Sequence, residues 1–275
     1  MTSYQPIELR KLTPKLGAEI AGVDLTAPLD PRTVDEIRQA LVQNGVIYLR
    51  DQKLSAKQLI EFGRHFGDLF VHPAGADVEY PEITRIYADE RSTRISGEEW
   101  HVDASFAAEP PMGTILNLEE MPAGGGGDTL FASMYSAYDA LSDAMKTLLI
   151  GLTATHSGEV LRGRYNADDG ATKYAETEHP VVCAHPVSGR KLLYVNQIYT
   201  TRVVQLKPKE SAALLAFLFA HVGTPEFQCR VTWQENSIAF WDNRCVQHRG
   251  VWDYYPDRRC GKRVQIKGTR PISAC

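Results

Sequence analysis

The sequence predicts a mainly β protein with peripheral helices, arranged as a sandwich or barrel. Many short segments are rich in β-branched or aromatic residues and are bounded by Gly, Pro, Asp or Asn. Only a few segments show helical periodicity, and the regular alternation of strand and helix that a parallel α/β sheet requires is missing. With 275 residues, 43% of them hydrophobic, the chain is long enough to bury one core, and we expect a single domain over residues 1–275.

The expected strands follow one another at close intervals along the chain. They are residues 18–23, 46–50, 83–87, 114–118, 191–195, 227–233 and 237–241. Helical spacing of apolar residues predicts helices over residues 31–42, 55–66 and 207–222. The first of these helices has Asp30 in the N-cap position and Pro31 at its first turn, which are favoured placements for both residue types.

Charge and cysteine usage exclude several classes of protein. The net charge is −4 and the isoelectric point about 6.1, so we expect no nucleic-acid partner. No run approaches the ~18 consecutive apolar residues of a membrane span, and the first residues lack the apolar core of a secretory signal. The five cysteines are scattered without a CxxC spacing, which indicates free thiols in a reducing compartment. We therefore expect a cytoplasmic protein that does not bind membranes.

His101-Val102-Asp103 is the sharpest local motif for metal binding. In an extended segment, residues i and i+2 face the same side, so an imidazole and a carboxylate would converge from one strand. An H-x-D motif alone is weak evidence, and its alternative interpretation is a surface ion pair. Further along, the apolar segment 237–241 is followed by His248, which on its own would be interpreted as a hydrogen-bonded structural histidine.

The combination of these residues indicates a specific chemistry. Two histidines and one carboxylate form the facial triad of non-haem Fe(II) oxygenases, which leaves three iron positions open. A chelating dicarboxylate would fill two of them, and its far carboxylate needs a bidentate donor such as arginine. Arg259 and Arg263 follow His248 and are four residues apart, so in a strand both would face one cavity.

The sequence resembles the taurine dioxygenase (TauD/TfdA) family of Fe(II)- and 2-oxoglutarate-dependent dioxygenases over nearly its whole length. The motifs that carry the resemblance are residues 16–25 (LGAEIAGVDL), 66–67 (FG), 100–103 (WHVD), 110–111 (PP), 126–129 (GGDT), 185–190 (HPVSGR), 193–196 (LYVN), 241–243 (WDN) and His248. The resemblance implies a double-stranded β-helix, or jelly roll, with helical additions.

The resemblance also implies the cofactors and their ligands. Fe(II) would be held by the triad, and 2-oxoglutarate and O2 would be the co-substrates. Thr129 and Arg259 would bind the distal carboxylate of 2-oxoglutarate, although Thr129 alone would be interpreted as a turn or strand residue. Arg263 would lie near the C1 carboxylate and the anionic group of the substrate. Trp241 would line the pocket or serve as a core aromatic residue.

For the substrate, the resemblance implies His72 and Tyr199 as pocket residues. Glycine stands at positions 75 and 97, where the taurine pattern has a tyrosine and an asparagine, and this departure argues against taurine itself. Residues 98–101, 134–138 and 194–197 are more similar to the branch that cleaves aryloxyalkanoates. We therefore expect a small to mid-sized anion, namely an aryloxyalkanoate, a sulfonate or an alkyl sulfate. Its hydroxylation would release succinate and CO2, and the hydroxylated product would fragment.

Several alternatives stay open on the sequence. The segment 158–174, with Arg162 and Arg164, is interpreted as a mobile lid or a solvated loop. The His/His/Asp set would also suit a jelly-roll metalloenzyme of another class, such as a zinc hydrolase. A non-catalytic binding protein could keep the same fold, although it would be expected to have lost a ligand. Apolar residues on the helices would allow a homo-oligomer, but no interface is evident in the sequence.

Overall fold

The computed structural model describes residues 6–71, 77–95, 97–162 and 174–274. Its strands are β1 (Glu8–Lys11), β2 (Ala18–Ala21), β3 (Val46–Leu49), β4 (Leu69–Phe70), β5 (Thr84–Ala88), β6 (Gly113–Glu120), β7 (Thr129–Ser133), β8 (Thr153–Ser157), β9 (Glu176–Pro180), β10 (Val182–Ala184), β11 (Lys191–Leu193), β12 (Thr200–Val203), β13 (Gln228–Val231), β14 (Ser237–Asp242), β15 (Val246–Gly250), β16 (Arg259–Ile266) and β17 (Ile272–Ser273). Its helices are α1 (Pro31–Asn44), α2 (Ala56–Arg64), α3 (Met134–Asp139), α4 (Asp143–Leu149) and α5 (Pro208–Val222), with short 3-10 helices η1 (Gly158–Leu161) and η2 (Pro225–Phe227).

The helices begin where the sequence indicates. The Asp30 side chain accepts a hydrogen bond from the backbone N–H of Arg32, 2.9 Å away, and Pro31 opens α1. The Ser55 side chain caps α2 and forms a reciprocal capping box with Gln58. Helix α1 ends at Gly45, whose φ of 71° suits glycine because it has no Cβ.

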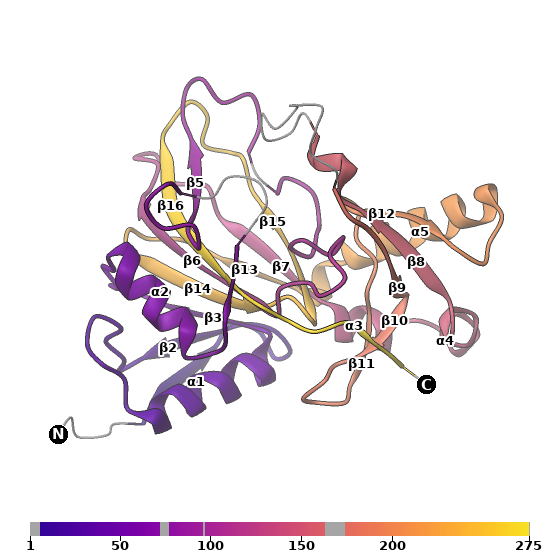
Figure 1. Ribbon diagram of the computed structural model, residues 1–275, viewed down its shortest axis with the longest axis horizontal. Coiled ribbons are helices and arrows are strands. Elements are labelled where there is room, and N and C mark those ends of the chain that lie inside the picture. Colours follow the sequence, from indigo (N-terminus) through magenta and orange to yellow (C-terminus); the bar gives the residue numbers. More distant parts are fainter. Residues whose placement is uncertain (1–5, 72–76, 96, 163–173, 275) are drawn as a thin grey trace.

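One large sheet forms the scaffold. Its hydrogen-bonded order is β1-β2-β3-β14-β6-β16-β4, and β5 also pairs with β16. A smaller antiparallel sheet, β13-β7-β15, crosses beside it in Figure 1. Two further small sheets, β12-β8-β9 and β11-β10-β17, extend the structure toward α4 and α5. Among the strand pairs of the described residues, only β2 and β3, which flank α1, run parallel.

Both faces of the large sheet are buried. Along β14, Ile238 and Phe240 pack with apolar residues of α1 and α2, whereas Ala239 and Trp241 point into the core shared with the small sheet β13-β7-β15. Figure 1 shows α1 and α2 on the outer face of the large sheet. The space between the two sheets therefore contains both apolar side chains and the site described below. The expected mainly β architecture with peripheral helices is confirmed.

Two other expectations concern the whole chain. Within the described ranges, no helix is both long enough and apolar enough to cross a membrane. The four described cysteines (Cys183, Cys229, Cys245 and Cys260) are free, and Cys275 lies outside the described residues. Burial raises the pKa of Cys229 to about 12, so this thiol stays protonated at neutral pH.

Candidate active site

The H-x-D motif lies at the edge of the small sheet. The motif is not a continuous extended segment: His101 forms only an isolated bridge with His248, and Asp103 begins a turn. The turn continues through Ala104, whose φ is 46°. The two side chains nevertheless converge, because the turn brings the Asp103 carboxylate back toward the ring of His101, with 3.7 Å between Nε2 and Oδ1.

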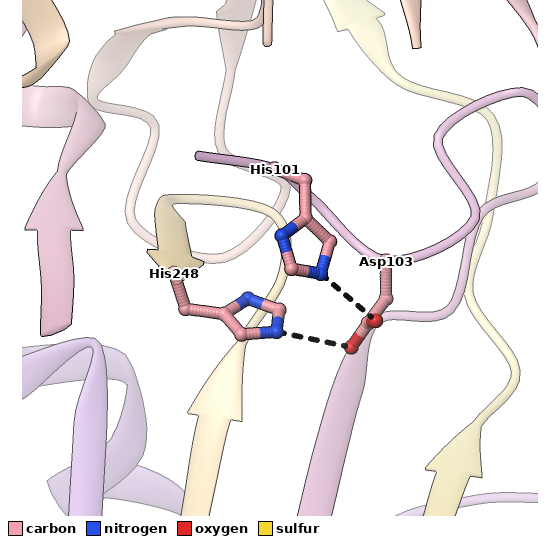
Figure 2. Close-up of side chains that lie close together, drawn as sticks. All are labelled: His101, Asp103 and His248. Carbon is pink, nitrogen blue, oxygen red and sulfur yellow. Dashed lines mark ion pairs between the residues drawn. The ribbon is translucent and has the colours of Figure 1, made fainter. Parts of the chain in front are cut away.

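His248 completes a compact set of three possible metal ligands. It lies in β15, and its Nε2 is 3.9 Å from Oδ2 of Asp103. One ligand atom from each of His101, Asp103 and His248 lies within 4.8 Å of the others, and all three residues are buried. Figure 2 shows the two rings arriving from different segments and directing a ring nitrogen at the carboxylate.

Hydrogen bonds and burial set the protonation of these groups. The Nδ1 of His101 lies 2.9 Å from the carbonyl oxygen of Glu99, which can only accept, so Nδ1 carries the proton and Nε2 keeps its lone pair. Burial lowers the pKa of His101, and burial together with the nearby His101 lowers that of His248. Both rings are therefore neutral at neutral pH, which is the form that binds metal.

Asp103 is ionised for a different reason. Burial alone would raise its pKa, but the charge of Arg263 and a hydrogen bond from Thr114 help to hold the pKa well below the usual range. Arg263 donates from Nη1 to Oδ1 at 3.1 Å, and Thr114 donates from its hydroxyl to Oδ2 at 2.7 Å. Two neutral imidazoles and one carboxylate are a donor set that fits Fe(II) with open coordination positions.

A pocket opens beside these ligands. Thr129, at the start of β7, and Arg259, at the start of β16, line the same pocket as His101 and His248. Arg259 is 7% exposed and its Nε has no hydrogen-bond partner among the described residues. Its guanidinium lies over the rings of Trp233 and Tyr254, with the carbon 5.9 and 6.0 Å from their centroids. A buried guanidinium with an unused donor fits an anionic ligand.

Thr129 is oriented by a tryptophan that the sequence did not single out. The indole Nε1 of Trp233 donates to Oγ1 of Thr129 at 3.0 Å. Because the indole can only donate, the hydroxyl proton of Thr129 remains free for another acceptor. The same tryptophan contacts Arg259, so Trp233 touches both residues that the resemblance assigns to one carboxylate.

Trp241 combines the two interpretations given to it. It lines the pocket and is also a fully buried core residue, with its ring centroid 4.6 Å from that of His248 and 5.5 Å from that of Phe131. Its Nε1 donates to the Asn243 side-chain oxygen at 2.9 Å. The residue therefore supports one wall of the site from within the core.

A second cluster of ligand-type residues lies outside this pocket. His185, Asp242 and Cys245 bring their polar atoms together, and all three are buried. However, Nδ1 of His185 accepts two backbone N–H groups, and its Nε2 donates to Asp242 at 3.1 Å. Asp242 is also bound by Arg244 through two bonds of 2.8 and 2.7 Å. Both ring nitrogens are in use, so this cluster is a structural hydrogen-bond network.

Comparison with known proteins identifies the family to which the chain belongs. The family model for the taurine catabolism dioxygenase TauD, TfdA family, matches residues 8–265. The chain belongs to the TauD/TfdA family. It is therefore an oxidoreductase that depends on 2-oxoglutarate (alpha-ketoglutarate), with Fe(II) and O2 as the other requirements of the reaction.

Individual relatives match most of the chain. An alpha-ketoglutarate-dependent sulfonate dioxygenase from Saccharomyces cerevisiae is 35% identical, over 97% of this chain and 68% of its own length. An alpha-ketoglutarate-dependent sulfate ester dioxygenase from Pseudomonas putida is 32% identical, over 97% and 91%. The crystal structure of a taurine dioxygenase from Burkholderia xenovorans has a TM-score of 0.85 at 33% identity, over 97% and 93%. The expected jelly roll is thereby confirmed.

Of the substrate residues His72 and Tyr199 expected from the TauD/TfdA resemblance, the structure describes Tyr199. Tyr199 is buried in an apolar cluster with Ala104 and Phe106, and its ring centroid is 5.2 Å from that of Phe106. Ala104 of this cluster directly follows Asp103 in the chain. His72 and Gly75 lie outside the described residues, as does Arg164 of the expected lid. Of that segment, residues 158–161 form η1, and Arg162 pairs with Glu159 at 2.9 Å.

Gly97, which stands where the taurine pattern has an asparagine, lies directly against the ring of His101. A Cβ at this position would lie 2.5 Å from Cε1 of His101, so the ring of the ligand already occupies that space. The φ of Gly97 is 76°, a conformation that side chains rarely adopt. In this member of the TauD/TfdA family, Gly97 therefore lets the chain pass close to His101.

Proposed function

We propose that His101, Asp103 and His248 hold Fe(II), and that Thr129 and Arg259 hold the distal carboxylate of 2-oxoglutarate. The observation that carries this proposal is the buried guanidinium of Arg259, which has an unused Nε donor in the pocket that His101 and His248 also line. Bound together, Fe(II) and 2-oxoglutarate supply an O2-derived oxidant for a C–H bond, with release of succinate and CO2. The chain contributes binding, orientation and exclusion of water.

Thr129 and Arg259, called the clamp below, each suit a carboxylate. Arg259 offers planar, charged donors, and Thr129 accepts from Trp233 with one lone pair and keeps its proton to donate to a carboxylate. Arg263 lies between the two parts of the site: it lines the pocket and donates to Asp103. We assign Arg263 to the C1 carboxylate of 2-oxoglutarate and to the anionic group of the substrate, with its bond to Asp103 fixing its position. Trp241 closes the wall behind His248.

We further propose an anionic substrate, namely a sulfonate, an alkyl sulfate or an aryloxyalkanoate. The charged groups at the pocket are Arg259, Arg263 and Asp103, which leave one positive charge among the described residues. Fe(II) adds two positive charges and 2-oxoglutarate removes two, so one positive charge remains for a monoanion to neutralise. Ile86, Ala88 and Ile95 add an apolar wall, which suits the hydrocarbon part of such a substrate. The sulfonate dioxygenase and the sulfate ester dioxygenase among the relatives support the same class of anionic substrate.

The test for the iron and 2-oxoglutarate sites is an anaerobic absorption spectrum with Fe(II), before and after 2-oxoglutarate. A broad charge-transfer band that needs both components supports the assignment. The matched pair is Arg259→Gln and Arg258→Gln, since Arg258 is the neighbouring but exposed arginine. We expect only Arg259→Gln to shift the 2-oxoglutarate titration to higher concentration. Fe(II) binding without any band would contradict the clamp, and absence of Fe(II) binding would contradict the triad.

The test for the substrate is succinate release over matched pairs of compounds. Each pair joins an anion to a neutral compound of similar shape: an alkyl sulfonate and its sulfonamide, an alkyl sulfate and the parent alcohol, and an aryloxyacetate and its amide. We expect stimulation by the anionic member of at least one pair. Stimulation by neutral or cationic compounds alone would overturn the proposed substrate class and leave the cofactor assignment intact.

A further inference from the structure

The carboxylate of Asp103 is held at both of its oxygens. Arg263 donates to Oδ1, and Thr114 donates to Oδ2 at 2.7 Å. Thr114 lies in β6, under the turn that carries Asp103, and is fully buried. Oδ2 is also the oxygen that faces Nε2 of His248. The orientation of the carboxylate between the two imidazoles therefore depends on a neutral hydroxyl as well as on a charged group.

The direction of each hydrogen bond around Thr114 is fixed by its neighbours. Trp241 Nε1 can only donate, and it donates to Oδ1 of Asn243, so the amide nitrogen of Asn243 must face Thr114, where it lies 3.0 Å from Oγ1. The ionised Asp103 can only accept, so the Thr114 proton points at Oδ2. The second lone pair of Thr114 accepts from Gln265 Nε2 at 3.3 Å. The hydroxyl thus uses its one proton and both lone pairs.

We propose that Thr114 is a positioning residue for the metal site, acting through Asp103. The direction of its hydrogen bond is fixed by Asn243 and Gln265, and this bond orients the Asp103 carboxylate for metal binding. The chain from Trp241 through Asn243 and Thr114 to Asp103 also links the wall beside His248 to the third ligand. All these residues are buried, so water cannot readily replace a hydrogen bond that a substitution removes. This inference rests on the proposed iron site.

Metal affinity is the property that such a role controls. Outer hydrogen-bond partners of metal ligands typically contribute about 10- to 100-fold in affinity. Thr114→Val keeps the shape of the side chain but removes the hydroxyl, and we expect the dissociation constant for the metal to rise by about that factor. Thr114→Ser keeps the hydroxyl and should restore the affinity to within a few-fold of the original. The Fe(II) concentration that half-saturates succinate release should rise by a similar factor in Thr114→Val and recover in Thr114→Ser.

The experiment is a titration of the metal-free protein with Mn(II) alone, in which binding is measured as loss of the EPR signal of free Mn(II). The Fe(II) dependence of succinate release is a second readout. Weaker binding in Thr114→Val with recovery in Thr114→Ser supports the proposal. Equal binding by Thr114→Val and the unmodified protein overturns it and leaves the proposed function standing. Absence of Mn(II) binding by the unmodified protein overturns both. If Thr114→Val does not fold, Thr114→Cys, which keeps only a weak donor, takes its place with the same expectation.

Discussion

His101 and His248 exchange a reciprocal pair of backbone hydrogen bonds, with N···O distances of 3.1 and 3.0 Å. One residue ends the loop before the H-x-D turn and the other lies in the middle of β15, so the bridge joins segments that are far apart in the sequence. It brings the two ring centroids to 4.1 Å. Two of the three proposed ligands are therefore fixed by the backbone, and Asp103 is the one held by side chains alone.

The first prediction concerns that third ligand. Asp103→Ala removes the carboxylate but leaves the two bridged histidines, so some metal binding should persist. We expect substrate-dependent succinate release to fall below detection. The Mn(II) dissociation constant should rise by more than about 100-fold, the upper end of what loss of a hydrogen-bond partner of a metal ligand typically causes. Asp68→Ala is the matched control, because Asp68 is an exposed aspartate. Hydroxylation at the normal rate by Asp103→Ala would remove this residue from the proposed triad.

The second prediction concerns the clamp for 2-oxoglutarate. Arg259→Gln removes a charged donor, and a hydrogen bond to a charged group is typically worth about 1.5–3 kcal/mol. We expect KM for 2-oxoglutarate to rise by about 10- to 100-fold, which corresponds to that range. Arg258→Gln should change KM by less than about two-fold, since surface charges contribute little. The measurement is steady-state succinate release at fixed substrate and Fe(II).

The same variant separates function from stability. Arg259 is buried, and burial lowers the pKa of its guanidinium, which means that the charge is poorly compensated in the metal-free protein. We therefore expect Arg259→Gln to leave the urea midpoint of the metal-free protein unchanged or higher, even though it weakens 2-oxoglutarate binding. A large loss of stability in this variant would mean that Arg259 has a structural role, and its effect on KM could then not be assigned to the clamp.

The third prediction uses two glycines of the loop before β7. Gly125 and Gly127 have φ values of 82° and 72°, so alanine at either position is strained by about 1–2 kcal/mol. Only at Gly127 would the added Cβ meet the clamp: it would lie 2.8 Å from Cδ of Arg259, whereas nothing lies within 4 Å at Gly125. Gly127→Ala should therefore raise KM for 2-oxoglutarate, and Gly125→Ala should lower stability alone. Equal KM values for the two variants would show that the loop does not position Arg259.

The sequence predicts the chemistry of this protein better than it predicts the local geometry. The seven expected strands and three expected helices all coincide with observed elements, because each has a clear period and clear boundaries. Strands β7, β15 and β16 were not among them, although they carry Thr129, His248 and both arginines. Polar side chains that serve the site interrupt the alternation by which strands are recognised. The same polar residues are what allowed the site to be predicted.

The supporting residues of the site could not be found in this way. Thr114 was predicted as a strand residue, but its contact with Asp103 depends on how β6 lies under the turn of the H-x-D motif. Trp233 and Asn243 similarly act through residues remote in sequence, at Thr129 and Thr114. The contact of Tyr199 with Phe106, in a cluster that also contains Ala104, likewise joins segments remote in the sequence. Register and loop path are tertiary properties that a single sequence does not specify.

The fourth prediction concerns pH and a histidine outside the catalytic pocket. His156 is fully buried in β8, where Nδ1 lies 3.0 Å from the Ser105 hydroxyl oxygen and Nε2 lies 3.4 Å from that of Thr200. Burial, and to a smaller degree the nearby His179, lower its pKa to about 3. An unfolded chain binds the proton near pH 6.5, so protonation favours unfolding. The stability contributed by neutral His156 is complete above pH 6.5 and is lost progressively as the pH falls toward 3.

This titration predicts a loss of about 2 kcal/mol of unfolding free energy by pH 5 from His156 alone. His156→Gln cannot take up that proton, so its curve of stability against pH should be flatter. The variant should be less stable than the unmodified protein at pH 7.5, and the difference should shrink as the pH falls. Urea unfolding of the metal-free protein between pH 7.5 and 5 measures this, with the exposed His65→Gln as the matched control. Parallel curves for the unmodified protein and His156→Gln would mean that acid acts elsewhere, because only a group that gains its proton on unfolding can make the two curves converge.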